Sequence, residues 1–198
     1  MKRVTVAITG ASGAIYALRT MRALLMYDVA VDVVISEFGW MLLRDEGGFE
    51  GKQQDLGTFI HDQYGVSVDH FTLHPYKDLG ATLASGSARS DGMVVVPCSM
   101  KTLAGIAHGL SRNLIERSAD VTLKERRPLI VVPRETPMSL IHLRNMVLAT
   151  EAGAVMVPAM PAFYQMPESF DDLADFIVGR ILSLLGVEHE LYPAWEGQ

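Results

Sequence analysis

The sequence predicts an α/β domain of the doubly wound kind, with a mainly parallel sheet covered by helices on both faces. Short apolar segments of strand length alternate with segments of helical periodicity. The clearest strand segments are unbroken runs rich in Val and Ile, as expected for strands buried on both faces. The 198 residues suit one domain, and the sequence contains neither a repeat nor a linker, so we expect a single domain over 1–198.

The amino-terminal half begins with a strand, a loop of small residues and a helix. Val4 to Thr9 is rich in β-branched residues and ends at a Gly-Ala-Ser-Gly loop, residues 10–13. Apolar residues then recur at helical spacing from Ala14 to Leu25. The next predicted elements are a strand at Val29–Ile35, a helix at Phe38–Asp45, a polar loop at Gly47–Gly57, a helix near Leu56–Tyr64 and a short strand near His70–His74.

The carboxyl-terminal half repeats the alternation. Met93 to Val96 is a fully apolar strand that Pro97 is expected to stop. The last residues, 186–198, are predicted to form a tail whose aromatic side chains dock on a neighbouring subunit. The remaining predicted elements are helices at Lys101–His108, Asn113–Glu125, Met138–Glu151 and Ser169–Leu185, and strands at Leu129–Val132 and Ala154–Val157. This order is typical of Rossmann-like and flavodoxin-like domains.

Composition excludes several classes of protein. Apolar residues make up 49% and charged residues 20% of the chain, which excludes global disorder. The formal charge of −6 disfavours a nucleic-acid partner. No apolar run reaches the length of a membrane span. Cys98 is the only cysteine, so no intrachain disulfide can form and a cytoplasmic location is expected. The six histidines lack metal-ligand spacing, and we expect no metal.

Two loops are the first candidates for a ligand site, because ligands of doubly wound sheets bind outside the carboxyl ends of the strands. Residues 10–13 open a helix, whose free N–H groups and dipole can hold an anion. The alternative is that these small residues only allow close packing of strand against helix. The second loop follows the Met93–Val96 strand, and its Ser99, Lys101 and Thr102 can bind a phosphate or a polar ring. Cys98 beside them is a candidate nucleophile, although a packing role is favoured.

A concentration of positive charge is the third candidate feature. Between Arg112 and Arg134 six cations face three acids, inside a chain that is negative overall. This asymmetry indicates an anionic ligand, and the alternative is a solvated helix face with pairs such as Asp120 with Lys124. From residues alone the prediction is therefore an α/β domain that binds phosphorylated small molecules.

Several longer motifs carry a resemblance to a known family. They are TGASGA at 9–14, ASGS at 84–87, PCSMKTL at 97–103, NLIERSAD at 113–120, LKERRPL at 123–129, VPRETP at 132–137, PAFY at 161–164 and Trp195 near the end. The chain resembles the UbiX family of flavin prenyltransferases over nearly its whole length. The resemblance implies that a dimethylallyl group from dimethylallyl monophosphate is joined to N5 and C6 of reduced FMN. The product is prenylated FMN, and no metal takes part.

The resemblance also implies residue roles. It assigns FMN binding to Gly10, Ala11, Ser12, Ser36, Ser99, Met100, Lys101, Thr102 and Arg134. It assigns the dimethylallyl phosphate to Arg117, Lys124, Tyr164 and Arg180. It assigns chemistry to Ser12, Glu46, Lys124 and Glu135. From residues alone, Glu46 and Arg180 could instead be ordinary surface residues and Tyr164 a core residue.

The family further implies a UbiD-type decarboxylase as recipient of the product and a large homo-oligomer, a dodecamer. Two other functions stay open. One is a flavin-dependent decarboxylase of a small aromatic acid, which needs a catalytic histidine for which His142 is the only candidate. The other is a non-catalytic FMN carrier, which would have no use for Glu135, Lys124 and Arg180 together.

Overall fold

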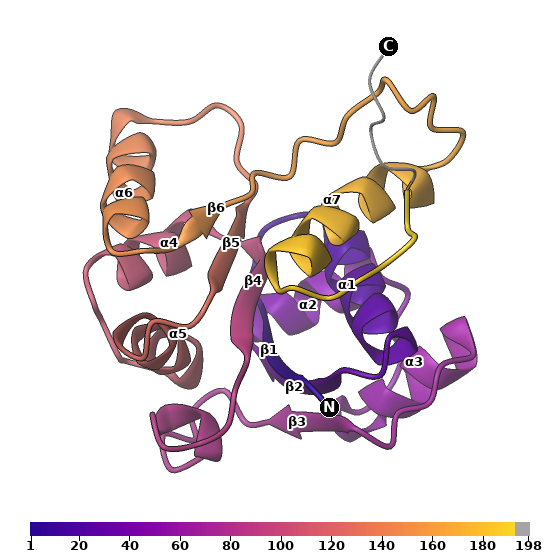
Figure 1. Ribbon diagram of the computed structural model, residues 1–198, viewed down its shortest axis with the longest axis horizontal. Coiled ribbons are helices and arrows are strands. Elements are labelled where there is room, and N and C mark those ends of the chain that lie inside the picture. The colour runs from indigo at the N-terminus through magenta and orange to yellow at the C-terminus, as the bar shows by residue number, and fades with distance from the viewer. Residues whose placement is uncertain (193–198) are drawn as a thin grey trace.

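The computed structural model describes residues 1–192 and contains one six-stranded parallel sheet in the order β3-β2-β1-β4-β5-β6 (Figure 1). The strands are β1 (Arg3–Ile8), β2 (Ala30–Ile35), β3 (Phe71–His74), β4 (Gly92–Cys98), β5 (Leu129–Pro133) and β6 (Val155–Met156). The helices are α1 (Ala14–Met26), α2 (Glu37–Asp45), α3 (Leu56–Tyr64), α4 (Met100–Ala107), α5 (Leu114–Lys124), α6 (Leu140–Glu151) and α7 (Phe170–Leu184), with short 3₁₀ helices η1 (Gln53–Asp55) and η2 (Thr82–Ala84).

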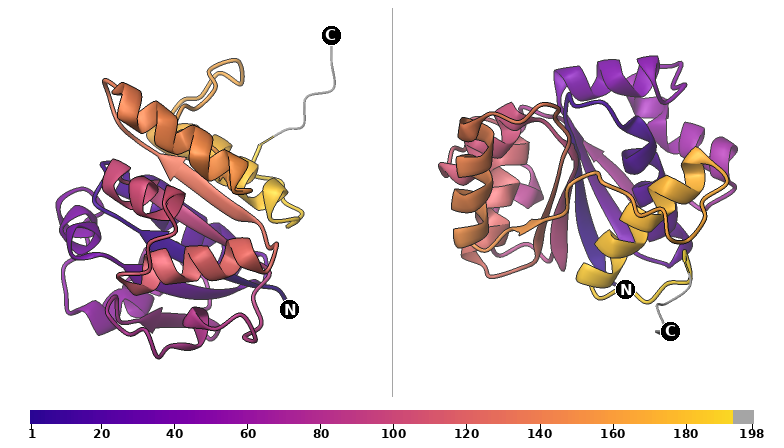
Figure 2. Two further views of the ribbon diagram at one scale, coloured as in Figure 1. Left: turned by 90° about the vertical axis from the view of Figure 1, so that its left-hand side faces the viewer. Right: turned by 90° about the horizontal axis from the view of Figure 1, so that it is seen from above.

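Side-chain alternation along the strands builds a separate core on each face of the sheet. On β4, Val94 and Val96 belong to the core beneath α1, α2, α3 and α7. Their neighbours Met93 and Val95 belong to the core beneath α4, α5 and α6. The two helical layers are seen on opposite sides of the sheet in Figure 2. This arrangement explains why the strand sequences are continuously apolar, because both faces of every central strand are covered by helices.

The chain reverses its direction of travel across the sheet between β1 and β4. The first three strands proceed outward from the centre, and β4 returns to pair with β1 on its other side. In a doubly wound sheet, the crevice at the carboxyl ends of two such strands is where ligands bind. The two loops singled out in the sequence, residues 10–13 and the loop with Ser99, leave β1 and β4, and they therefore meet at this point.

The predicted fold class is confirmed, with small differences at the element ends. The strand predicted to stop at Val96 continues through Pro97 to Cys98, and its register with β5 shifts between Val95 and Cys98. This irregularity accommodates a residue that has no N–H to donate. The segment predicted as a loop at Gly47–Gly57 contains η1, and α3 starts at Leu56. Within residues 1–192, no helix combines the length and the apolar character needed to cross a bilayer.

Helix α6 is unusual because it is apolar on its exposed side as well. Ile141 is 69% exposed and Val147 is 56% exposed, and Leu140, Leu143 and Leu148 are exposed as well. Phe163, in the segment before α7, and Phe170, the first residue of α7, are exposed as well. Exposed apolar groups gathered on one helix are typical of a surface that another protein covers.

Candidate functional site

The loops after β1 and β4 are tied together by Thr9, a residue that the sequence analysis did not single out. The Thr9 hydroxyl donates to the Pro97 carbonyl oxygen at 2.8 Å and accepts the Ser99 N–H at 2.7 Å. Its backbone N–H also donates to the same carbonyl, at 3.2 Å. Thr9 is 1% exposed, so these bonds are shielded from water. One buried side chain therefore fixes the position of one loop relative to the other.

The first loop is occupied by an acid from elsewhere in the chain. Glu46 follows α2, and its Oε2 accepts the N–H groups of Gly13 at 2.7 Å and Ala14 at 3.2 Å. Partial burial of the carboxyl opposes its charge, but hydrogen bonds from this loop and the charge of Arg134 outweigh that effect and hold the pKa of Glu46 below its ordinary value. The anion expected at the start of α1 is thus, in part, the protein's own carboxylate.

Ser12 and Glu46 lie together, as the sequence hypothesis required. Burial of the Glu46 carboxyl raises its pKa, and hydrogen bonds to the carboxylate lower it. The Ser12 hydroxyl donates one of these hydrogen bonds. Ser12 and Gly10 are exposed to solvent on the rim of the loop, whereas Ala11 between them is buried. At Gly10 a Cβ atom would lie 2.4 Å from the Phe38 Cβ, which explains why only glycine fits there.

Serine caps place the other predicted flavin contacts. Ser36 ends β2 and caps α2, accepting the Gly39 N–H at 3.0 Å. Ser99 caps α4, accepting the Thr102 N–H at 3.3 Å and donating to the Thr102 hydroxyl at 3.1 Å. The start of α4 therefore presents Met100 and Lys101, with Lys101 exposed and Met100 half-buried. A short polar segment is held rigidly at the sheet edge in each case.

Arg134 joins both loops from the end of β5. Its Nε donates to the Ser12 carbonyl oxygen at 3.1 Å, and its backbone N–H donates to the Cys98 carbonyl oxygen at 3.4 Å. Glu135 follows it, half-buried, and its carboxylate accepts the Thr136 N–H at 3.0 Å. The predicted residues at 10–12, 36, 46, 99–102, 134 and 135 consequently gather at the carboxyl edge of the sheet.

Arg117 and Lys124 are not part of that gathering within the single chain. Lys124 ends α5 just before β5, and its ammonium pairs with Glu125 close to Gly86. Arg117 donates to the Ala84 carbonyl oxygen at 3.0 Å and pairs with Asp120 at 2.7 Å. Residues 84–90 precede β4, so Lys124, at the end of α5, lies toward the amino ends of the strands. Arg117 lies about two turns earlier on that helix, whose first residue donates to the Tyr76 carbonyl oxygen after β3. The pair of Asp120 with Lys124 that the alternative interpretation named is replaced by Asp120 with Arg117 and Lys124 with Glu125.

Tyr164 and Arg180 lie near α7. Tyr164 follows β6, is 57% exposed, and sets its ring edge-on against Phe176 with centroids 6.1 Å apart. Arg180 is exposed on α7 and has no ion pair among residues 1–192. Of the predicted tail, Tyr192 packs on Phe176 of its own chain at 5.4 Å, whereas Trp195 lies outside the described residues. Docking of the tail on a neighbour stays a prediction.

Two alternative chemistries lose their candidates. Cys98 is fully buried, and desolvation raises the pKa of its thiol far above the ordinary value, so it packs rather than attacks. His142 belongs to a capping box at the start of α6, where its Nδ1 accepts the Ser139 N–H at 3.2 Å. Among the described residues no group of three or more His, Cys, Asp or Glu side chains could hold a metal.

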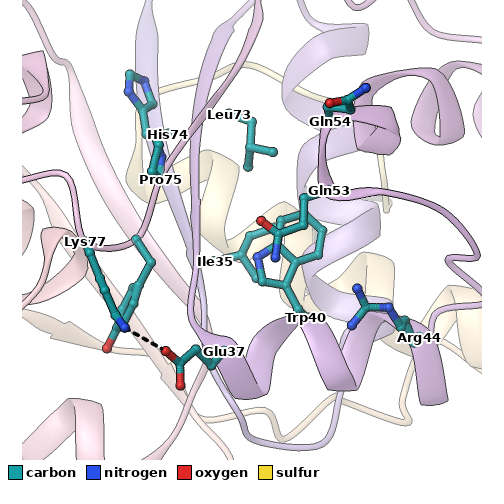
Figure 3. Close-up of a pocket in the computed structure, with 11 residues that line it drawn as sticks. Ile35, Glu37, Trp40, Arg44, Gln53, Gln54, Leu73, His74, Pro75 and Lys77 are labelled. Carbon is teal, nitrogen blue, oxygen red and sulfur yellow. Dashed lines mark ion pairs between the residues drawn. The ribbon is translucent and has the colours of Figure 1, made fainter.

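A cavity of about 630 Å³ opens beside the Ser36 loop, at the carboxyl ends of β2 and β3. Trp40, Arg44 and the two glutamines of η1 form one wall, and the ion pair of Glu37 with Lys77, at 3.2 Å, closes part of the other (Figure 3). None of the residues assigned by the resemblance lines it. This cavity and the predicted flavin loops are thus neighbours, not the same place.

Comparison with known proteins identifies the family. Residues 1–182 match the family described as Flavoprotein. A flavin prenyltransferase UbiX of Alkalihalophilus pseudofirmus is 46% identical over 194 residues, which cover 98% of this chain and 96% of the relative. The chain belongs to the UbiX family of flavin prenyltransferases. The resemblance expressed by the motifs is therefore confirmed over nearly the full length.

Solved UbiX-family structures share the fold closely. AnUbiX (PadA1), in complex with FMN and dimethylallyl pyrophosphate, is 42% identical, with a TM-score of 0.88 over 100% of this chain and 98% of that one. A dodecameric FMN-dependent UbiX-like decarboxylase from Escherichia coli O157:H7 is 41% identical, with a TM-score of 0.86 over 98% of this chain and 100% of that one.

Proposed function

We propose that this UbiX-family chain joins the dimethylallyl group of dimethylallyl monophosphate to N5 and C6 of reduced FMN and so makes prenylated FMN. The observation that carries the proposal is the convergence of the family-matched loop residues at the switch point between β1 and β4, locked by Thr9 and Arg134. The solved relative with the highest TM-score described above holds FMN together with a dimethylallyl diphosphate.

The residues at this edge fit a flavin mononucleotide. The first loop offers the exposed residues Gly10 and Ser12, Lys101 offers an exposed ammonium, and Arg134 is half-buried. Such donors suit a phosphate and the carbonyl oxygens of an isoalloxazine ring. Reduced FMN supplies the nucleophilic N5 and C6 when bound. Ser36 and Thr102 complete the donor set on the adjoining helix starts.

Proton handling falls to two carboxyl groups. The low pKa of Glu46, for which hydrogen bonds and Arg134 outweigh the opposing burial, makes it an ionised acceptor beside Ser12, suited to the proton that leaves N5. Glu135 stands next to Arg134 and is proposed to exchange a proton with the departing phosphate. When the donor's C–O bond breaks, the electron pair leaves with the phosphate, whose growing charge needs fixed cations.

Those cations are proposed to come from more than one subunit. Lys124 ends α5 at the opposite edge from the flavin loops of its own chain, so it can reach a phosphate at those loops only from a neighbouring copy. Arg117 lies on the same helix and is proposed to act with it. The exposed apolar side of α6 supports association of copies. A relative of 41% identity is dodecameric, and we propose a large homo-oligomer of that kind here, with Tyr164 and Arg180 also contacting the donor.

The recipient of the product and the cellular compartment are also proposed. A UbiD-type decarboxylase is the proposed recipient of prenylated FMN, and the reducing cytoplasm is the proposed compartment for a chain with one buried thiol. The Escherichia coli relative is described as a decarboxylase, which supports the alternative function. That function needs a catalytic histidine, however, and the one candidate, His142, caps α6.

One experiment tests the function directly. Purified protein is incubated anaerobically with reduced FMN and dimethylallyl monophosphate, and the mass of the released flavin is measured. A gain of one C5 prenyl unit is expected. Unchanged flavin with CO₂ lost from an added aromatic acid would instead establish a decarboxylase, and unchanged flavin without chemistry would establish a carrier. A parallel arm with the diphosphate donor decides which donor is used.

A further inference from the structure

A second polar cavity lies at the amino ends of β1 and β2, toward the edge opposite the flavin loops. It measures about 390 Å³, within the range of small-molecule sites of about 300–1,000 Å³. The cavity is enclosed by the sheet, by α5 and by residues 82–90. Its lining includes three arginines and three serines, namely Arg3, Arg89, Arg127, Ser85, Ser90 and Ser118. Lys124, the cation proposed for the prenyl donor, does not line it.

Ser118 is the feature that marks this cavity as a binding site. Its side chain is 3% exposed, and within residues 1–192 its hydroxyl is the only buried side-chain N or O atom without a hydrogen-bond partner. Thr122, one turn later, does not share this state, because its hydroxyl donates to the Ser118 carbonyl oxygen at 2.7 Å. Buried hydroxyl groups are almost always paired, so the Ser118 hydroxyl calls for a partner in the cavity.

The charge of the lining selects an anion. Each arginine donates one side-chain hydrogen bond within the protein. Arg3 Nη1 donates to Asp32 at 2.9 Å. Arg89 Nη2 donates to the Met1 carbonyl oxygen at 3.1 Å, and Arg127 Nη2 donates to the Gly86 carbonyl oxygen at 2.8 Å. Their other donors have no partner among the described residues. Asp32 is the one acid of the lining, and both its oxygens are already bonded, to Arg3 and to His74. Guanidinium and hydroxyl donors without acceptors fit a tetrahedral oxyanion.

We propose that this cavity binds a phosphate group, held by Arg3, Arg127 and the Ser118 hydroxyl. The ligand is inorganic phosphate or the monoester of a small alcohol, since the volume accommodates an organic part. Binding ties residues 85–90 to α5 and to the start of β1, and so fixes the loop at Gly86 against which Lys124 lies. The three residues that hold the phosphate are other than those assigned to flavin or donor.

Isothermal titration of the FMN-loaded oligomer tests the proposal, with inorganic phosphate, glycerol 3-phosphate and glycerol as probes. Saturable binding of at least one phosphate probe and none of glycerol is expected. Tighter binding of the ester identifies a monoester as the ligand, and equal or tighter binding of inorganic phosphate identifies the free ion. The absence of phosphate binding at millimolar concentration would show that the cavity holds only water and would overturn the proposal.

Matched variants locate the binding. Arg127→Gln should weaken phosphate at least tenfold, because a charge-assisted hydrogen bond is lost, whereas Arg126→Gln removes the same charge from the adjacent exposed residue and should change it less than twofold. Ser118→Ala, a small change that preserves the helix, should weaken it about three- to tenfold. In Lys124→Ala the binding should persist. If Lys124→Ala abolishes binding while Arg127→Gln and Ser118→Ala do not, the phosphate sits elsewhere and the assignment is wrong.

Discussion

The Thr9 hydroxyl accepts the Ser99 N–H at 2.7 Å, and this bond connects the end of β1 to the cap of α4. The same oxygen donates to the Pro97 carbonyl oxygen at 2.8 Å. A buried hydroxyl used in both directions leaves no freedom between the two loops. Because the proposed flavin contacts lie on both loops, their mutual position depends on Thr9 together with Arg134.

Thr9→Val keeps the shape of the side chain and removes both hydrogen bonds. The Ser99 N–H loses its partner, whereas the Pro97 carbonyl oxygen keeps the Thr9 backbone N–H, and the free energy of unfolding should fall by about 1–3 kcal/mol. We also expect FMN to bind at least several-fold more weakly, since the loop after β4 can then shift. Thr9→Ser, which retains the hydroxyl, is the control. Urea unfolding and flavin fluorescence titration measure the two effects, and equal FMN affinity in both variants would contradict a positioning role.

Glu46 should make stability depend on pH in the acidic range. Burial opposes its charge, but hydrogen bonds from the first loop dominate and lower its pKa in the folded chain. The contribution of Glu46 to the free energy of unfolding is therefore fully present above the pKa that this carboxyl has in the unfolded chain. It is lost as pH falls through the lower pKa of the folded chain. Glu46→Gln should flatten this part of the profile and cost about 0.5–1 kcal/mol at neutral pH, a small value because the carboxyl is partly exposed.

Denaturant unfolding of the wild type and Glu46→Gln at several pH values checks this expectation. Glu50→Gln changes a nearby exposed acid and should leave the profile as in the wild type. Parallel profiles for the wild type and Glu46→Gln would show that the carboxylate does not act on the start of α1.

The fold could be predicted because its signals are local. Strands such as β2 and β5 are short apolar runs with β-branched residues, and the switch-point rule then places the loops after β1 and β4 together. The cap of α1 by Glu46 could not be predicted, because the contact joins residues 33 apart through the turn after α2. Thr9 carried a weak signal, a hydroxyl at the last position before the loop, which reads equally well as an ordinary strand residue.

The charged stretch from Arg112 to Arg134 shows why sequence proximity misled. Its first part lies on α5, whose 11 residues cover about 16 Å at 1.5 Å per residue. The chain then traverses β5 in the opposite direction before it reaches Arg134. Lys124 and Arg134 are therefore separated by the length of a strand, although only ten positions apart. A count of charges along the sequence does not reveal that the chain reverses its direction between α5 and β5.

Ile141→Glu tests whether the apolar side of α6 is covered by another copy. Ile141 is 69% exposed in the single chain, so the monomer fold should tolerate the change. A charge buried in an interface is costly, and the variant should elute as a smaller particle with unchanged circular dichroism. Gln63→Glu adds the same charge on exposed α3 and should leave the particle size as in the wild type. Unchanged light scattering for Ile141→Glu would exclude this face from the interface.

Lys124→Ala and Arg180→Ala should each lower turnover about 100- to 1,000-fold while FMN remains bound, because a donor that stabilises the departing phosphate is lost. The rate of prenylated FMN formation and the bound flavin absorbance separate the two effects. Full activity in both variants would refute the cationic clamp.

Mixed oligomers decide whether Lys124 acts from a neighbouring copy. Lys124→Ala and Arg134→Ala chains are each expected to be nearly inactive alone. If every site combines Arg134 of one copy with Lys124 of another, random co-assembly in equal amounts restores about a quarter of the sites, since each of the two contributions is intact with a chance of about one half. Co-assembly of Lys124→Ala with Arg117→Ala is the control, because both cations lie on α5 of the same copy and no site regains both. If the first mixture shows no recovery, Lys124 and Arg134 do not meet in a site shared between copies. Because the two residues lie at opposite ends of the sheet in one chain, they cannot meet within a single copy either, and the proposed mechanism would then fail.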